Sequence, residues 1–189
     1  ADYEKVFAEK IVWVKGMSGS ERRLAFRRGD LAATRENPAA YKKHVEPVIA
    51  EGKAYTWFHH GLLDVATGNH VKDPNFTEPT LEALYEERWG VTPSGDFYDA
   101  YKLVKSWRDA LQKAFWVNAG NPNKDKLVDA LNKMLMDPDS VAAIEKKVGK
   151  YEWRTGVDGD NAVKTLKTFI TPNALKTLSD FGKNQLGFN

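Results

Sequence analysis

The chain has 189 residues, and its 28 Lys and Arg against 26 Asp and Glu give a formal net charge of +2. A charge this small argues against a dedicated nucleic-acid binder, which carries a strong basic bias. The chain contains no Cys, which excludes disulfides, thiolate metal sites and a cysteine nucleophile. Hydrophobic residues at 42% and charged residues at 29% are typical of a globular protein.

The first part of the chain predicts a strand, a helix and a second strand. Residues 11–14 (Ile-Val-Trp-Val) are β-branched or aromatic, which favours a buried strand. Ser18 and Glu21 have the spacing of a capping box, which predicts that a helix begins there. Residues 31–34 predict a second short strand. We therefore expect a βαβ unit of a parallel sheet over residues 10–34.

Later helices are indicated by a capping side chain followed by proline, which suits the first position of a helix. This two-residue motif occurs at Asn37-Pro38, Asn121-Pro122, Asp137-Pro138 and Thr171-Pro172. It predicts helices over about 38–51, 122–136, 138–148 and 172–186. Further helices are expected over 3–9, 80–88, 97–111 and 160–169, strands over 55–59 and 115–117, and loops over 64–79 and 89–96.

The turn between the first strand and its helix is the best candidate for a binding site. Gly16 permits an unusual backbone angle, and a helix N-terminus offers free N–H groups to a carboxylate or phosphate. The hydroxyls of Ser18 and Ser20 add hydrogen-bond donors. The alternative is an ordinary capped helix, because Glu21 places a negative charge in the same turn.

The end of the second predicted strand offers a further candidate at Thr34 and Arg35. Ligands of open parallel sheets bind beyond the carboxyl ends of the strands. The Arg35 guanidinium could then clamp a carboxylate with two hydrogen bonds. The alternative is that Arg35 forms an ion pair with Glu36 or another acidic residue.

Catalytic and metal sites find less support in the sequence. Gly16-Met17-Ser18-Gly19-Ser20 nearly matches the elbow of a serine hydrolase, and Asp30 and His59 or His60 follow in the required order. We keep an α/β hydrolase that uses Ser18 as the alternative function. No metal is expected, because neighbouring His59 and His60 would point to opposite faces of a strand. The absence of a glycine-rich nucleotide motif leads us to expect no cofactor.

Several segments in order resemble one family of transport proteins. Residues 11–21 (IVWVKGMSGSE) and 24–31 (LAFRRGDL) look like one motif region of that family. The loop at 73–81 (DPNFTEPTL) and the stretch from Phe115 to Pro138 are similar to its later motifs. The family is that of the periplasmic solute receptors of tripartite tricarboxylate transporters, the Bug-type proteins.

This resemblance implies an α/β fold of the type II periplasmic binding-protein kind, with a parallel-rich sheet, flanking helices and an incomplete two-lobe architecture. It implies that residues 1–112 form much of the second lobe, and that residues 113–189 return to the first lobe. The chain would be the C-terminal portion of a receptor.

The resemblance also implies a function without catalysis. The chain would capture a small organic carboxylate in the periplasm and deliver it to the membrane permease subunits, with no nucleic-acid partner. The family's ligand residues correspond here to Gly16, Met17, Ser18, Gly19 and Ser20, with Thr34 and Arg35 as a further pair. A third hypothesis is a structural or partner-binding module that has lost ligand capture.

Overall fold

The computed structural model describes residues 12–111, 114–148 and 151–187. The helix predicted over 3–9 lies outside these residues, and so does Ile11 of the first predicted strand. The described residues form two compact units. Among the described residues, unit 1 comprises 12–55 and 178–187, and unit 2 comprises those between 56 and 177. The lobe boundary expected after residue 112 stays a prediction.

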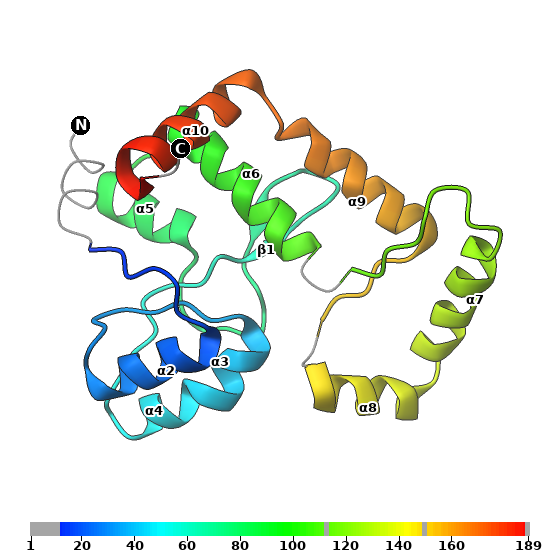
Figure 1. The fold of residues 1–189 in the computed structure, drawn as a ribbon, viewed down its shortest axis with the longest axis horizontal. Coiled ribbons are helices and arrows are strands. Elements are labelled where there is room, and N and C mark those ends of the chain that lie inside the picture. Colours follow the sequence, from blue (N-terminus) through cyan, green and yellow to red (C-terminus); the bar gives the residue numbers. More distant parts are fainter. Residues whose placement is uncertain (1–11, 112–113, 149–150, 188–189) are drawn as a thin grey trace. The chain divides into compact units, whose positions relative to one another are not determined.

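Helices make up 56% of the described residues, and strands make up 4%. The helices are α2 (Gly19–Arg28), α3 (Pro38–His44), α4 (Glu46–Ala50), α5 (Leu81–Trp89), α6 (Asp96–Ala110), α7 (Lys124–Leu135), α8 (Pro138–Val148), α9 (Gly156–Thr168) and α10 (Pro172–Leu186) (Figure 1). The strands are β1 (Leu62–Leu63) and β2 (His70–Val71), which pair antiparallel.

The predicted α/β fold of the type II periplasmic binding-protein kind, with a parallel-rich sheet, is therefore wrong, because the structure is mostly helical and its sheet has two antiparallel strands. In the described part of the chain, residues 12–14, 31–34 and 115–117 form no strand. Of the strand predicted over 55–59, only His59 takes part in a β-bridge, which is parallel and reaches Thr80. The expected βαβ unit thus keeps its helix and neither of its strands.

Several helices were predictable because their start signals act within one turn, but Asn121-Pro122 does not begin a helix, since α7 starts at Lys124. Ser18, Asn37 and Thr80 each accept the backbone N–H three residues ahead, as N-cap residues do. A strand instead needs a neighbouring strand for its hydrogen bonds, so β-branched and aromatic residues alone do not form one. The helix predicted over 38–51 is divided at Val45, because Pro47 has no N–H for a helical hydrogen bond.

Small and aliphatic side chains form the core of each unit. In unit 1, Ala25 of α2 and Val48 of α4 are buried. In unit 2, helix α6 packs against α9 and β1. The indole of Trp107 on α6 donates a hydrogen bond to the Leu166 carbonyl of α9 over 3.0 Å. The buried apolar side chains of unit 2 are Leu63, Ala100, Leu103, Ala162, Leu166 and Ala174.

Candidate functional site

The turn that leads into α2 is closed by its own side chains. Gly16 has a φ of 82°, which is the left-handed region. The Ser18 hydroxyl accepts the Glu21 N–H over 3.3 Å, and the Glu21 carboxylate accepts the Ser18 N–H over 2.7 Å. The bonds to Ser18 lower the pKa of Glu21, so an acidic group already sits at this helix start. In the described part of the chain, the N–H groups of Gly19 and Ser20 make no hydrogen bond.

A hollow of about 310 Å³ lies beside this turn in unit 1 and carries cationic side chains. Arg27 donates a hydrogen bond to the His44 carbonyl over 3.2 Å, which ties α2 to the end of α3. Desolvation and the nearby cations Arg23 and Lys43 lower the pKa of His44. We call this hollow the α2 groove, and its lining residues are Ser20, Arg23, Leu24, Arg27 and His44.

The residues that α2 contributes to the groove lie on one face of that helix, because they are spaced by three or four positions. Of the residues that the sequence predicted to bind a ligand, Ser20 lines it. Arg23, Arg27 and His44 were not predicted from the sequence as ligand-binding residues. Their spacing on α2 and the basic last turn of α3 were the signals that could have found them.

Glu36 neutralises part of the charge near the α2 groove. Its side chain is 4% exposed and forms ion pairs with Arg22 at 3.2 Å and with Arg23 at 3.4 Å. Arg27 forms no ion pair with another described residue, although its charge contributes to the lowered pKa of Glu51. An anion that enters the groove would therefore meet Arg27 as its principal cationic partner.

Thr34 and Arg35 occupy an irregular segment of unit 1 rather than the end of a strand. The Thr34 hydroxyl is buried and has no hydrogen-bond partner among the described residues. Arg35 is exposed and does not pair with Glu36, whose partners are the two arginines of α2. The predicted ion pair of Arg35 with Glu36 is therefore wrong, and Arg35 forms no ion pair with any other residue that the structure describes.

The candidate catalytic residues of a Ser18 hydrolase form hydrogen bonds or ion pairs with other residues instead of with one another. The Ser18 hydroxyl caps α2, and Asp30 pairs with Arg28 at 2.6 Å. His59 accepts the Gly61 N–H over 2.9 Å and stacks on Phe76.

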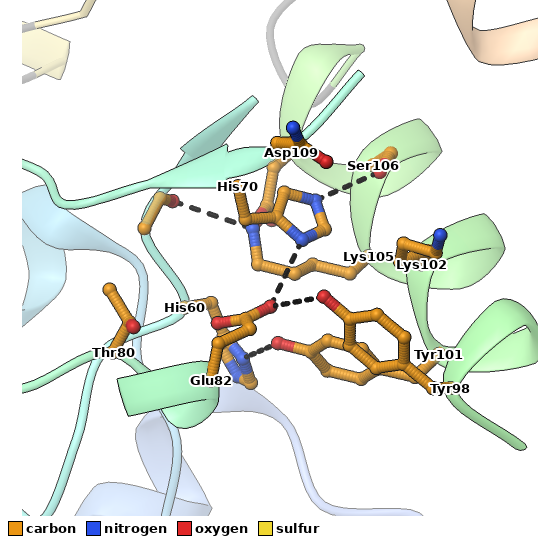
Figure 2. A network of polar contacts seen from close by, with 12 residues as sticks. His60, His70, Thr80, Glu82, Tyr98, Tyr101, Lys102, Lys105, Ser106 and Asp109 are labelled. Atoms are coloured by element: carbon orange, nitrogen blue, oxygen red, sulfur yellow. Dashed lines mark hydrogen bonds and ion pairs between the residues drawn. The ribbon is translucent and has the colours of Figure 1, made fainter. Parts of the chain in front are cut away.

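A buried polar network holds three elements of unit 2 together (Figure 2). His70 of β2 lies between Ser106 of α6, at 2.9 Å from Nε2 to Oγ, and Glu82 of α5, at 3.3 Å from Nδ1 to Oε1. Tyr98 also donates its hydroxyl to Glu82 over 3.2 Å. Burial raises the pKa of Glu82, but the bonds from His70 and Tyr98 outweigh it and leave that pKa lowered.

The ionised Glu82 determines how the protons of this network are placed. A carboxylate only accepts hydrogen bonds, so His70 donates from Nδ1 and, when neutral, accepts the Ser106 hydroxyl proton at Nε2. Ser106, His70 and Glu82 thus have the order of a nucleophile, a base and its orienting group. However, Ser106 is 0% exposed in the middle of α6, so a substrate cannot reach its hydroxyl. We interpret the network as a structural link between β2, α5 and α6.

Further polar residues continue the network along α6. The Tyr101 hydroxyl lies 2.8 Å from Nδ1 of His60. Burial lowers the pKa of His60 and raises that of Tyr101. Lys105 pairs with Asp109 at 3.0 Å and reaches the Gly61 carbonyl, and burial lowers its pKa. No sequence motif predicts this network, because its members come from separate elements.

The comparisons with known proteins add no relative. No protein-family model matches the chain, and no curated protein or solved structure matches it either. Within the described residues, no group of three or more His, Asp or Glu side chains is placed to hold a metal ion. None of the helices described here is long and apolar enough to cross a membrane.

Proposed function

We propose that the chain binds a small organic carboxylate in the α2 groove of unit 1. The observation that carries this proposal is the hollow of about 310 Å³ in which Arg27 forms no ion pair within the described part of the chain. A guanidinium binds a carboxylate through two parallel hydrogen bonds. Ser20 adds a hydroxyl, and Arg23 adds a second guanidinium, partly neutralised by Glu36.

The position of the α2 groove also supports the proposal. It adjoins the turn at Gly16–Ser20, which the resemblance to the Bug-type receptors and the argument from helix N-termini both select as an anion site. The N–H groups of Gly19 and Ser20 point out of the same helix start. The capping carboxylate of Glu21 opposes an anion there, which favours the side of α2 that carries Arg23 and Arg27.

The wider role that we propose follows from the sequence resemblance. The chain would act in the periplasm as part of a solute receptor, and it would pass its carboxylate ligand to the permease subunits of a tripartite tricarboxylate transporter. This role needs binding and release rather than catalysis.

A titration with simple carboxylates tests the binding step. We expect succinate and citrate to bind the full chain, and succinamide, which has the same shape without charge, to bind much more weakly. Arg27→Gln should weaken succinate binding about fivefold to tenfold, since a charge-assisted hydrogen bond contributes about 1–1.5 kcal/mol in an open site. Calorimetry or NMR chemical shifts would measure both effects.

The neighbouring Arg28→Gln variant provides the matched control. Arg28 is also exposed on α2, but it pairs with Asp30 and does not line the groove. Equal losses in the Arg27 and Arg28 variants would indicate general attraction to a basic helix and would contradict the proposed site. Failure of the unmodified chain to bind any of these carboxylates would contradict the function itself.

A further inference from the structure

A second hollow, of about 490 Å³, lies within unit 2 and is separate from the α2 groove. Its volume lies in the range of pockets that hold small molecules. One wall is α9, which is drawn in orange in Figure 1, and the other walls are the chain after β1 and the segment before α9. We call it the α9 groove; its lining residues are Val65, Ala66, Glu152, Trp153, Arg154, Asp158, Asn161, Lys164 and Thr165.

Hydrogen bonds to the backbone fix two sides of the α9 groove. Arg154 donates to the Leu63 carbonyl over 3.2 Å and forms an ion pair with Glu152 at 2.8 Å. On the α9 side, the Thr165 hydroxyl donates to the Val65 carbonyl over 2.9 Å. These bonds connect the β1 segment to both other walls of the hollow.

Three polar side chains of α9 line the groove and have no partner among the described residues. They are Asp158, Asn161 and Lys164, and all three are exposed. Their spacing of three residues turns each side chain by about 60° from the one before it, so the three form a slanted row along the groove. The backbone positions of Asp158 and Lys164 are six residues apart, which corresponds to about 9 Å along the helix axis.

The geometry points to a site for a zwitterion whose ammonium and carboxylate groups stand apart, such as an ω-amino acid or a dipeptide. The carboxylate of the ligand would pair with Lys164, and the ammonium of the ligand would pair with Asp158. Asn161 would contact the part of the ligand between the two charges. Trp153 would pack against the apolar part of the ligand. This inference is independent of the proposed carboxylate site in unit 1.

Ligands that carry one sign of charge fit the α9 groove less well. An anion would pair with Lys164 but would also face the carboxylates of Asp158 and Glu152. A cation would pair with Asp158 but would face Lys164 and Arg154. An α-amino acid has both charges on one carbon, so it cannot reach both ends of a row about 9 Å long.

The test is an NMR titration of the full chain with 5-aminopentanoate. Pentanoate and pentylamine, which each keep one of its charges, serve as ligand controls. We expect 5-aminopentanoate to bind in about the millimolar range and to shift the amide signals around Asp158 and Lys164. Each single-charge compound should bind about threefold to fivefold more weakly, as expected for the loss of one exposed ion pair.

Two variants and a matched control complete the test. Lys164→Gln and Asp158→Asn should each weaken 5-aminopentanoate binding about threefold to fivefold. Lys167→Gln changes an exposed lysine of the same helix that does not line the groove, and it should leave binding unchanged. Equal binding by pentylamine or pentanoate, or an equal loss in the Lys167 variant, would overturn the inference. Arg27→Gln should leave this titration unchanged, which separates the two sites.

Discussion

Nε2 of His70 lies 2.9 Å from Oγ of Ser106, and neither side chain is exposed to solvent. The pair joins β2 to α6, and Glu82 extends it to α5. A buried imidazole must find partners for both of its ring nitrogens, because an unmet polar group inside a protein lowers stability. Ser106 therefore satisfies His70 inside the protein, although the same two residue types form the reactive pair of hydrolases.

Removal of the Ser106 hydroxyl should destabilise the protein. Ser106→Ala leaves Nε2 of His70 buried without its hydrogen-bond partner, and we expect a loss of about 1–3 kcal/mol in the free energy of unfolding. Urea unfolding followed by Trp fluorescence would measure it. Ser179→Ala, at an exposed position of α10, should change the stability by less than about 0.5 kcal/mol. An Ser106→Ala variant as stable as the Ser179 control would show that the network does not hold unit 2 together.

Acidification should destabilise the protein between about pH 6.5 and pH 5. Burial holds the folded-state pKa of His60 below the ordinary value of 6.5, so below pH 6.5 the unfolded chain binds more protons than the folded one. The free energy of unfolding therefore falls as the pH decreases through this window. His44 and His59 have lowered pKa values too and act in the same direction.

Urea titrations at pH 7.5 and pH 5 would measure this effect, and His60→Gln should reduce the difference between the two. The lowered pKa of Glu82 adds a further loss only below its ordinary value of 4.5, outside the measured interval. A stability that is equal at both pH values, or greater at pH 5, would contradict the assignment of buried, neutral histidines.

Helices could be predicted where their start signals are local, but α7 begins at Lys124 rather than at Pro122, and α9 begins at Gly156 rather than at Asp160. Pro138 and Pro172 begin α8 and α10, where the sequence places them. The strands could not be predicted, because residues 12–14 and 115–117 have strand composition but no partner strand among the described residues. β2 forms instead inside a segment that was predicted to be a loop.

The candidate site shows the same limit. The capping box of Ser18 and Glu21 was predictable from its spacing and is confirmed. The α2 groove also needs His44, which α3 brings to α2. The partners of Glu36 are arginines one helix earlier in the chain, rather than the adjacent Arg35. Contacts between separate helices bring these residues together, and their spacing in the sequence does not predict such contacts.

Gly61 should be far less tolerant of substitution than Gly90, although both have φ values near 70°. A Cβ at Gly61 would lie 2.4 Å from the Val71 carbonyl oxygen, whereas a Cβ at Gly90 would meet open space. Gly90→Ala should cost only the strain of a left-handed residue, about 1–2 kcal/mol. Gly61→Ala should cost about 1–3 kcal/mol more, because the β1–β2 region must move. Equal melting temperatures of the two variants would contradict the close approach at Gly61.

Glu36→Gln should change stability and anion binding in opposite directions. The substitution keeps the shape of a side chain that is 4% exposed but removes the charge that pairs with Arg22 and Arg23. We expect a loss of about 1–3 kcal/mol in the free energy of unfolding, since the two guanidiniums keep partial contact with water. The same change frees Arg23, which lines the α2 groove, so succinate should bind about threefold to fivefold more tightly. Urea unfolding and calorimetric titration of one preparation would measure both. If the affinity instead fell together with the stability, the positive charge of the α2 groove would not be what binds the carboxylate.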